Sequence, residues 1–425
     1  MSGRLFSIGA SLLLLAALLA APAGGVSANG DAPTVPTAWS FGPPTTFPST
    51  GGGWSRFDGE YYPLNGRVYF LGGREGGVTY GDVYYFDSNT WTYADTGVDM
   101  PVPVTNYDIA LLWDGSQWGM YIFGGRPSAG GTTNTTQVYY PATNTVADLT
   151  ATDPMPLQAG GVPVAPYVAV YNNRAYVFGG LQVTAPPYVT DETWVFDPTA
   201  PAGSRWTNLN APLNMARAYI TTAVVDGYIY AIGGDTFDGA ALYPVSIVER
   251  LNTANIAAGW DDAGVADLPL PSSGIEGCDE SRAFGFNTNS PFTGMGGKIV
   301  LAGCGQWPNT VSDAFIYDVA TNTWQAWEFL NEARRNHAGA LIPFAQGTGT
   351  PGMWVFGGYD VSGANNTVST EYRTLTSQPT SVNLADFSAS SGAPTRSWAE
   401  PVLWAALLAG VGLMGLALGL SRRRA

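Results

Sequence analysis

Six segments of the chain share one pattern, in which a run of apolar residues ends in a glycine doublet. The first glycines of these doublets lie 52, 55, 54, 70 and 54 residues apart. A period near 50 residues indicates one supersecondary unit repeated along the chain, which constrains the fold more than any other feature. The doublets are Gly72-Gly73, Gly124-Gly125, Gly179-Gly180, Gly233-Gly234, Gly303-Cys304 and Gly357-Gly358, the fifth with cysteine in second place.

Each repeat predicts four strands. A first apolar stretch leads through a turn to the run that ends in the doublet, and a third strand follows after a polar loop. A tryptophan then opens the fourth strand, where its large ring can fill the space between neighbouring sheets. Four antiparallel strands per unit, repeated around an axis, predict a β-propeller. The tryptophans are Trp91, Trp206, Trp260 and Trp324.

These repeats resemble kelch repeats over residues 35–376. The resemblance implies an all-β, six-bladed kelch propeller of four-stranded antiparallel blades, similar to the central domain of galactose oxidase. The second repeat has Val146 in place of the tryptophan, and the sixth has none after Tyr372. Trp39 precedes the first repeat, so we expect it to supply the fourth strand of the sixth blade and remove an open edge. The alternative is that Trp39 is an isolated linker aromatic.

Both ends of the chain predict export. Residues 1–28 have the charge and the Leu/Ala run of a signal peptide. Residues 377–398 are rich in Ser, Ala and Pro, which predicts a flexible stalk. Residues 399–425 contain an uncharged span followed by three arginines, which predicts a transmembrane helix with a cytoplasmic tail. This tail also resembles a bacterial Pro-Glu-Pro-type sorting signal, although Ala399 stands in the first proline position.

The two cysteines, Cys278 and Cys304, both fall in the fifth repeat. One precedes the first strand of that repeat and the other follows the second strand, so the two should meet on one rim of the propeller. Because export leads to an oxidising compartment, we predict a disulfide between them. The alternative is two free thiols.

The formal net charge of −15 argues against nucleic acid and anionic lipid surfaces as partners. No metal or cofactor is expected, because the sequence lacks a calcium-loop motif. The acidic pairs Asp261-Asp262 and Asp279-Glu280 are interpreted as solvated turns rather than metal ligands.

Arginines at the starts of the first strands are the main candidates for a binding site. A guanidinium group forms paired hydrogen bonds to carboxylate or sulfate, and aromatic side chains after the doublets can stack on sugar rings. The alternative is that these arginines only hold the blades together. The ligand-binding candidates are Arg56, Arg217, Arg282, Arg335, His337, Trp307 and Tyr359. Arg56 and Arg217 both lie 16 residues before their doublets, which predicts equivalent positions.

Catalysis is not the first expectation. A copper radical oxidase of the galactose oxidase kind needs two histidine ligands, and His337 is the single histidine. We expect a monomeric, surface-anchored propeller that binds protein or glycan without catalysis. The alternatives are a carbohydrate-active enzyme resembling sialate epimerases, with His337 as an acid–base group, and an architectural envelope protein.

Overall fold

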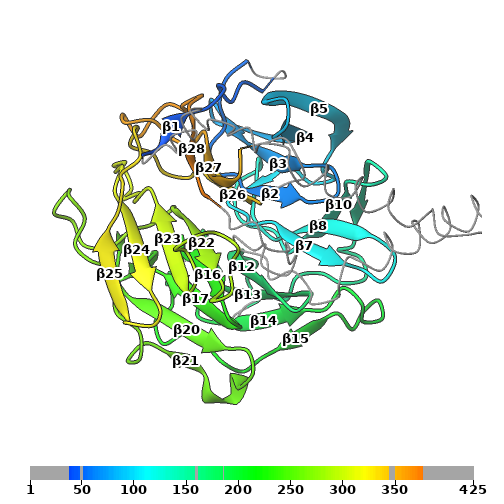
Figure 1. Ribbon diagram of the computed structural model, residues 1–425. Helices are drawn as coiled ribbons and strands as arrows, with labels where there is room; N and C mark the ends of the chain where they lie inside the picture. Colours follow the sequence, from blue (N-terminus) through cyan, green and yellow to red (C-terminus); the bar gives the residue numbers. More distant parts are fainter. Residues whose placement is uncertain (1–37, 48–50, 158–160, 185, 344–349, 377–425) are drawn as a thin grey trace, which may run out of the picture. The chain divides into compact units, whose positions relative to one another are not determined.

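The computed structural model describes residues 38–47, 51–157, 161–184, 186–343 and 350–376, and its strands form six four-stranded antiparallel sheets around an axis (Figure 1). No α-helix occurs in the described part of the chain, which has one 3₁₀ turn, η1 (Ile256–Ala258). All-β architecture, six blades and four strands per blade are therefore confirmed.

The blades follow the repeats in order. The first contains β2 (Gly59–Tyr62), β3 (Arg67–Glu75), β4 (Val78–Asp87) and β5 (Thr92–Asp99), and the second contains β7 (Ala110–Trp113), β8 (Trp118–Phe123), β10 (Thr136–Tyr140) and β11 (Thr145–Asp148). The third contains β12 (Ala165–Tyr171), β13 (Arg174–Leu181), β14 (Thr193–Phe196) and β15 (Trp206–Asn208), and the fourth contains β16 (Thr221–Val225), β17 (Tyr228–Ile232), β20 (Val248–Asn252) and β21 (Trp260–Asp261). The fifth contains β22 (Arg282–Phe286), β23 (Lys298–Ala302), β24 (Ala314–Asp318) and β25 (Thr323–Ala326), and the sixth contains β26 (Ala338–Ile342), β27 (Gly352–Phe356), β28 (Thr370–Thr374) and β1 (Ser40–Phe41).

Two short sheets extend the main ones. In the second blade β6 (Val104–Thr105) pairs with β9 (Arg126–Pro127), and in the fourth blade β18 (Asp235–Phe237) pairs with β19 (Leu242–Pro244). The first strands β2, β7, β12, β16, β22 and β26 each contact the next around the axis, and β26 contacts β2. The ring of blades is therefore closed.

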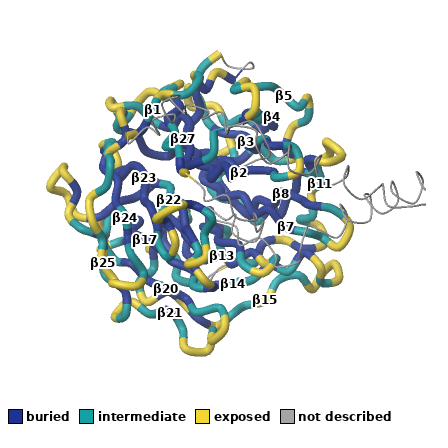
Figure 2. Tube along the Cα trace, in the orientation of Figure 1, coloured by how far each residue is buried: buried dark blue, intermediate teal, exposed yellow. Residues whose placement is uncertain are grey.

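Burial falls from the axis to the rim (Figure 2). Every residue of β16, β26 and β27 is buried, whereas most residues of the outermost strands β5 and β25 are partly or fully exposed. Strands buried on both faces carry continuous runs of Val, Ile, Ala and aromatic residues, because apolar residues cover each other between neighbouring blades.

The glycine doublets form the joints between blades. Gly357 has a φ of 55°, and a Cβ on it would lie 2.6 Å from the carbonyl oxygen of Trp54 in the next blade. The following N–H, of Gly358, donates to that same carbonyl oxygen at 2.8 Å. Gly180 and Gly234 make the equivalent bonds to Arg217 and Cys278, at 2.9 and 2.7 Å. Glycine has no Cβ, so it permits this close approach of two backbones.

The N-terminal strand closes the sixth blade, as predicted. Ser40 pairs with Tyr372 and Phe41 with Glu371 in an antiparallel register. The Trp39 side chain is buried, and its indole N–H donates to the carbonyl oxygen of Glu328 at 2.9 Å. The sixth sheet is therefore built from both ends of the propeller, so β28 has a partner on its outer edge.

The predicted disulfide between Cys278 and Cys304 is present, with a Cα–Cα distance of 4.8 Å and both side chains fully buried. It joins the segment before β22 to the residue after β23. The predicted signal peptide, stalk and C-terminal tail lie outside the described residues. Among the described residues, no helix has the length and apolar character needed to cross a membrane.

Candidate functional site

The first strands start at one face of the propeller, where the second strands end; we call this the loop face. At this face, five residues that lie two to four positions before the first strands adopt left-handed backbone conformations with φ between 49° and 59°. Side chains other than glycine rarely adopt this conformation, so the surrounding structure must hold it in place. These residues, which we call the mouth ring, are Arg56, Asn106, Tyr219, Glu280 and Asn336.

Backbone hydrogen bonds link the mouth ring around the axis. The N–H of Asn106 donates to Arg56, Arg56 to Asn336, Asn336 to Glu280 and Glu280 to Tyr219, at distances of 2.8 to 3.2 Å. At the corresponding place in the third blade stands Pro166, which has no N–H to donate. The chain of bonds therefore opens at the third blade, and the five side chains surround a small polar pocket.

Arg282 lies in the channel below the mouth ring. Its Nε is 3.2 Å from Asp58 Oδ1, its Nη1 is 3.5 Å from Asp108 Oδ1, and its Nη2 donates to the Phe57 carbonyl oxygen at 2.8 Å. Burial raises the pKa of both carboxyl groups, and that of Asp108 rises to about 7 because Asp58 is also close. Arg282 therefore contacts two buried carboxyl groups and ties blades 1, 2 and 5 together.

Two small pockets lie at the mouth ring and below it. Both are lined by Asp108, Ser281 and Arg282, and each has a free volume of about 20 Å³. A single water molecule needs about 10–15 Å³. Each of these two pockets therefore holds water-sized groups and has no room for a sugar ring.

An acidic cluster lies beside the mouth ring, where blades 4, 5 and 6 meet. Asp235, Asp279 and Glu280 are all buried, and the carboxyl groups of Asp235 and Asp279 hydrogen-bond each other. Glu280 is neutralised by Arg335, whose Nη1 is 2.7 Å from Glu280 Oε2. Burial, together with the neighbouring acidic groups, raises the pKa of Asp279 well above its usual range. The expectation that Asp279-Glu280 is a solvated turn is therefore wrong.

Tyr359 is held between two of the predicted arginines. Arg56 Nε donates to its hydroxyl oxygen at 3.0 Å, and the Arg335 guanidinium carbon lies 4.3 Å from the centre of its ring. Burial alone would raise the pKa of Tyr359, but the charges of Arg56 and Arg74 and the hydrogen bond from Arg56 lower it. The structure thus brings Arg56, Arg335 and Tyr359 together at the loop face.

Two further arginines follow the glycine doublets of the first two blades. Arg74 lowers the pKa of Tyr359, and Arg126 partly offsets the burial that raises the pKa of Tyr219, which places both charges near the mouth ring. Within the described part of the chain, neither Arg74 nor Arg126 forms a salt bridge with a carboxylate. Both are partly exposed, so they offer positive charge at the loop face of an acidic protein.

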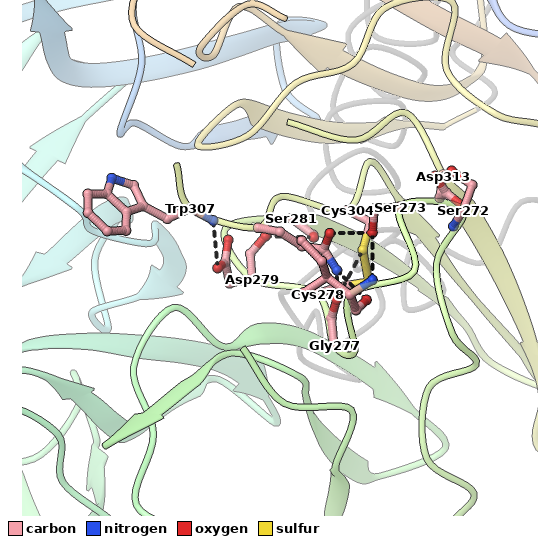
Figure 3. Close-up of a disulfide and its surroundings, with 11 residues drawn as sticks. Ser272, Ser273, Gly277, Cys278, Asp279, Ser281, Cys304, Trp307 and Asp313 are labelled. Carbon is pink, nitrogen blue, oxygen red and sulfur yellow. Dashed lines mark hydrogen bonds between the residues drawn. A yellow bond between two sulfur atoms is a disulfide. The ribbon is translucent and has the colours of Figure 1, made fainter. Parts of the chain in front are cut away.

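Trp307 and Val361 are exposed apolar residues on adjoining loops. Their exposed fractions are 62% and 79%. The Pro308 carbonyl oxygen lies against Gly363, and Arg335 Nη2 donates to the Gly363 carbonyl oxygen at 3.0 Å, which joins the two loops. Figure 3 shows the Trp307 ring pointing away from the disulfide, while its backbone N–H donates to Asp279 Oδ2 at 3.2 Å.

Arg217 does not face the channel. It is fully buried inside the fourth blade, where it donates to the carbonyl oxygens of Gly233 and Ile247 and pairs with Glu249 at 2.9 Å. Its counterpart is Arg334, which makes the same contacts to Gly357, Ser369 and Glu371. The predicted equivalence of Arg56 and Arg217 is wrong.

The reason for this error lies in the turns. Four residues join β2 to β3, whereas two residues join β16 to β17. Equal spacing to the doublet therefore places Arg217 two residues out of register with Arg56, and Tyr219 occupies the equivalent position.

His337 is also buried away from the channel. Its Nε2 lies 3.1 Å from the Ala302 carbonyl oxygen, so the neutral ring donates a hydrogen bond there. Burial, with the nearby charges of Arg334 and Arg282, lowers the pKa of His337 well below its usual range. A neutral, enclosed imidazole of this kind supports packing between blades and does not fit the expected acid–base role.

The prediction missed the carboxyl groups that accompany the arginines. Asp58, Asp108 and Asp235 precede or follow strands in different blades, and only the closed ring brings them next to arginines from distant repeats. A signal was present in the sequence: Asp58 and Asp108 lie in corresponding positions, each two residues beyond a mouth-ring residue. In the described residues, no group of three or more metal-ligating side chains comes together.

Comparison with known proteins agrees with this geometry. Residues 60–247 match a family model described as the KLHDC2/KLHL20/DRC7 kelch-repeats domain. A solved structure described as "Structure of YjhT" superimposes with a TM-score of 0.56 over 79% of this chain and 99% of that chain, at 16% sequence identity. At this identity the likeness shows the fold alone. No curated protein sequence matches the chain. Residues 60–247 are therefore similar to a kelch-repeats domain, and the described chain folds as a six-bladed β-propeller.

Proposed function

We propose that this propeller is a non-catalytic binding module that docks another protein on its loop face. The observation that carries the proposal is the exposed pair Trp307 and Val361 beside positively charged residues. Tryptophan and arginine are enriched among residues that contribute most to protein–protein binding. Kelch domains commonly bind proteins, which supports the same reading.

The charges of the loop face favour an acidic partner surface. Arg74 and Arg126 have no carboxylate partner among the described residues, while Arg56 and Arg335 are held rigidly by Tyr359 and Glu280. An arginine without a partner gains paired hydrogen bonds when it meets a carboxylate, at a small cost because it is already near the site. We therefore expect the partner to present acidic side chains next to an apolar one.

The alternative of a carbohydrate-active enzyme receives less support. The two pockets around Arg282 are each too small for a sugar, and His337 is enclosed and neutral. Binding of a glycan on the outer surface, stacked on Trp307, remains the second candidate because that ring is exposed. Display on the outside of a cell stays part of the proposal and is supported by the disulfide, which forms in oxidising compartments.

A paired selection tests the proposal. The full chain is panned against a random peptide display library and, in parallel, probed on a glycan array. We expect acidic, apolar peptides whose affinity falls about tenfold or more in Trp307→Ala, as for hot-spot residues. Leu64→Ala is the matched control, since Leu64 is 59% exposed on the opposite face. Binding of glycans alone would support the second candidate, and peptides insensitive to Trp307→Ala would contradict the site.

A further inference from the structure

The acidic cluster holds one feature that partner binding does not explain. Asp235 and Asp279 are buried, with exposed fractions of 4% and 0%, and their carboxyl groups lie within hydrogen-bonding reach of each other. Because two ionised carboxylates have no hydrogen to share, a hydrogen bond between them requires that one of them keeps a proton. A backbone hydrogen bond holds the two aspartates close together: the N–H of Gly234, which precedes Asp235, donates to the carbonyl oxygen of Cys278, which precedes Asp279, at 2.7 Å.

Asp235 Oδ1 and Asp279 Oδ1 are buried and receive no hydrogen bond from any other described residue, which leaves them free to share one proton. The other oxygen of Asp279 accepts the backbone N–H of Trp307 at 3.2 Å, so the pair is joined directly to the loop that carries the exposed tryptophan. Arg335 acts on Asp235 but already pairs with Glu280, so a second negative charge here would have no cation of its own among the described residues.

The charged and titratable groups around the pair come from three blades. Tyr219 faces it from blade 4, Glu280 from blade 5 and Arg335 from blade 6. Arg335 already pairs with Glu280 at 2.7 Å, so its positive charge mainly offsets the negative charge of Glu280. Ionisation of both Asp235 and Asp279 would therefore place two like charges together in a buried site.

We infer that the Asp235–Asp279 pair is a single-proton lock that holds the Trp307 loop against the joint of blades 4 and 5 and loosens as the pH rises. The consequence for partner binding rests on the proposed function. The lock itself is a property of the free protein, so it is tested without any partner.

The direction in which pH changes the stability of the closed loop follows from proton linkage. Burial, with Asp279 and Glu280 nearby, raises the pKa of Asp235 to about 7. The closed state therefore keeps a proton that an opened, solvated carboxyl would lose above its usual pKa of about 4. Stability of the closed loop is fully present at acidic pH and falls as the pH rises from about 4 to about 7, by up to tenfold in the opening equilibrium per pH unit.

Hydrogen exchange of the full chain at pH 5.0 and pH 7.5, corrected for intrinsic exchange, measures this opening. We expect protection of residues 303–311 to fall by about tenfold or more between the two conditions, whereas Asp235→Asn abolishes the difference. The amide of this variant can still donate to Asp279 but carries no titrating proton. Asp238→Asn, in the exposed turn between β18 and β19, is the matched control and should behave as wild type.

Two results would overturn the lock. One is equal protection of the Trp307 loop at both pH values in the wild type, and the other is an unchanged pH response in Asp235→Asn. If Asp235→Asn does not fold, Asp279→Asn provides the same comparison, because its amide oxygen can still accept the Trp307 N–H. A failed peptide selection would contradict the proposed function and leave this measurement unaffected.

Discussion

Two of the most deeply buried charges in the described propeller are arginines that do the same structural work in different blades. Arg217 and Arg334 each donate to two backbone carbonyl oxygens and pair with a glutamate that is itself fully buried, Glu249 and Glu371. The alternative interpretation of strand-start arginines, that they hold the blades together, is therefore right for Arg217. Arg56 and Arg335 instead surround Tyr359 at the loop face, and the sequence pattern does not separate the two roles.

Arg217→Ala tests the structural role. The substitution leaves Glu249 buried without its cation, which typically costs about 3–5 kcal/mol in the free energy of unfolding. Arg174→Ala is the control, because Arg174 pairs with Asp197 on the surface and such pairs contribute about 0–1 kcal/mol. Chemical denaturation measures both, and equal losses would contradict the assignment.

At the scale of elements, the repeat pattern predicts the blades well because each doublet has a local cause. The joint between blades requires glycine at a positive φ and a free N–H, and both needs are visible in the sequence. Register is not visible in this way, since the connection between the first two strands varies from two residues in the fourth blade to the 11 residues 287–297 in the fifth. Contacts among Asp58, Asp108 and Arg282 escaped prediction because only ring closure brings these repeats together.

The closing strand β1 is predicted to carry much of its stability in one side chain. Trp39→Ala removes a buried indole and its hydrogen bond to Glu328, and loss of a buried large aromatic residue costs about 3–5 kcal/mol. Phe41→Ala, in the same strand, should cost little, because Phe41 is 56% exposed. Thermal unfolding compares the two variants, and similar melting temperatures would show that Trp39 does not close the ring.

The disulfide should stabilise the fifth blade mainly by restricting the unfolded chain. With 26 residues separating Cys278 and Cys304, the chain-entropy model gives about 3 kcal/mol. The double variant Cys278→Ser/Cys304→Ser should lose about that amount in denaturation, and the reduced wild type should match it. A double variant as stable as the oxidised protein would contradict this contribution.

At the scale of the propeller, closure by an N-terminal strand places the first and last described residues of the propeller, 38 and 376, on one side. β1 runs toward the loop face, β28 runs away from it, and Thr376 accepts a hydrogen bond from Thr293 in the turn between β22 and β23, on the opposite face. Segments that tether the propeller through residues after 376 would therefore leave the loop face free. This geometry suits a module that presents Trp307 and Val361 to a partner.

The central claim is that the loop face, and not the opposite face, contacts another protein. A photo-crosslinking amino acid is placed at Trp307 or at Leu64, two exposed positions on opposite faces with exposed fractions of 62% and 59%. The full-length chain is then irradiated in the cells that produce it. The account predicts a discrete protein adduct from position 307 and none from position 64. Adducts from position 64 alone, or equal adducts from both, would contradict it.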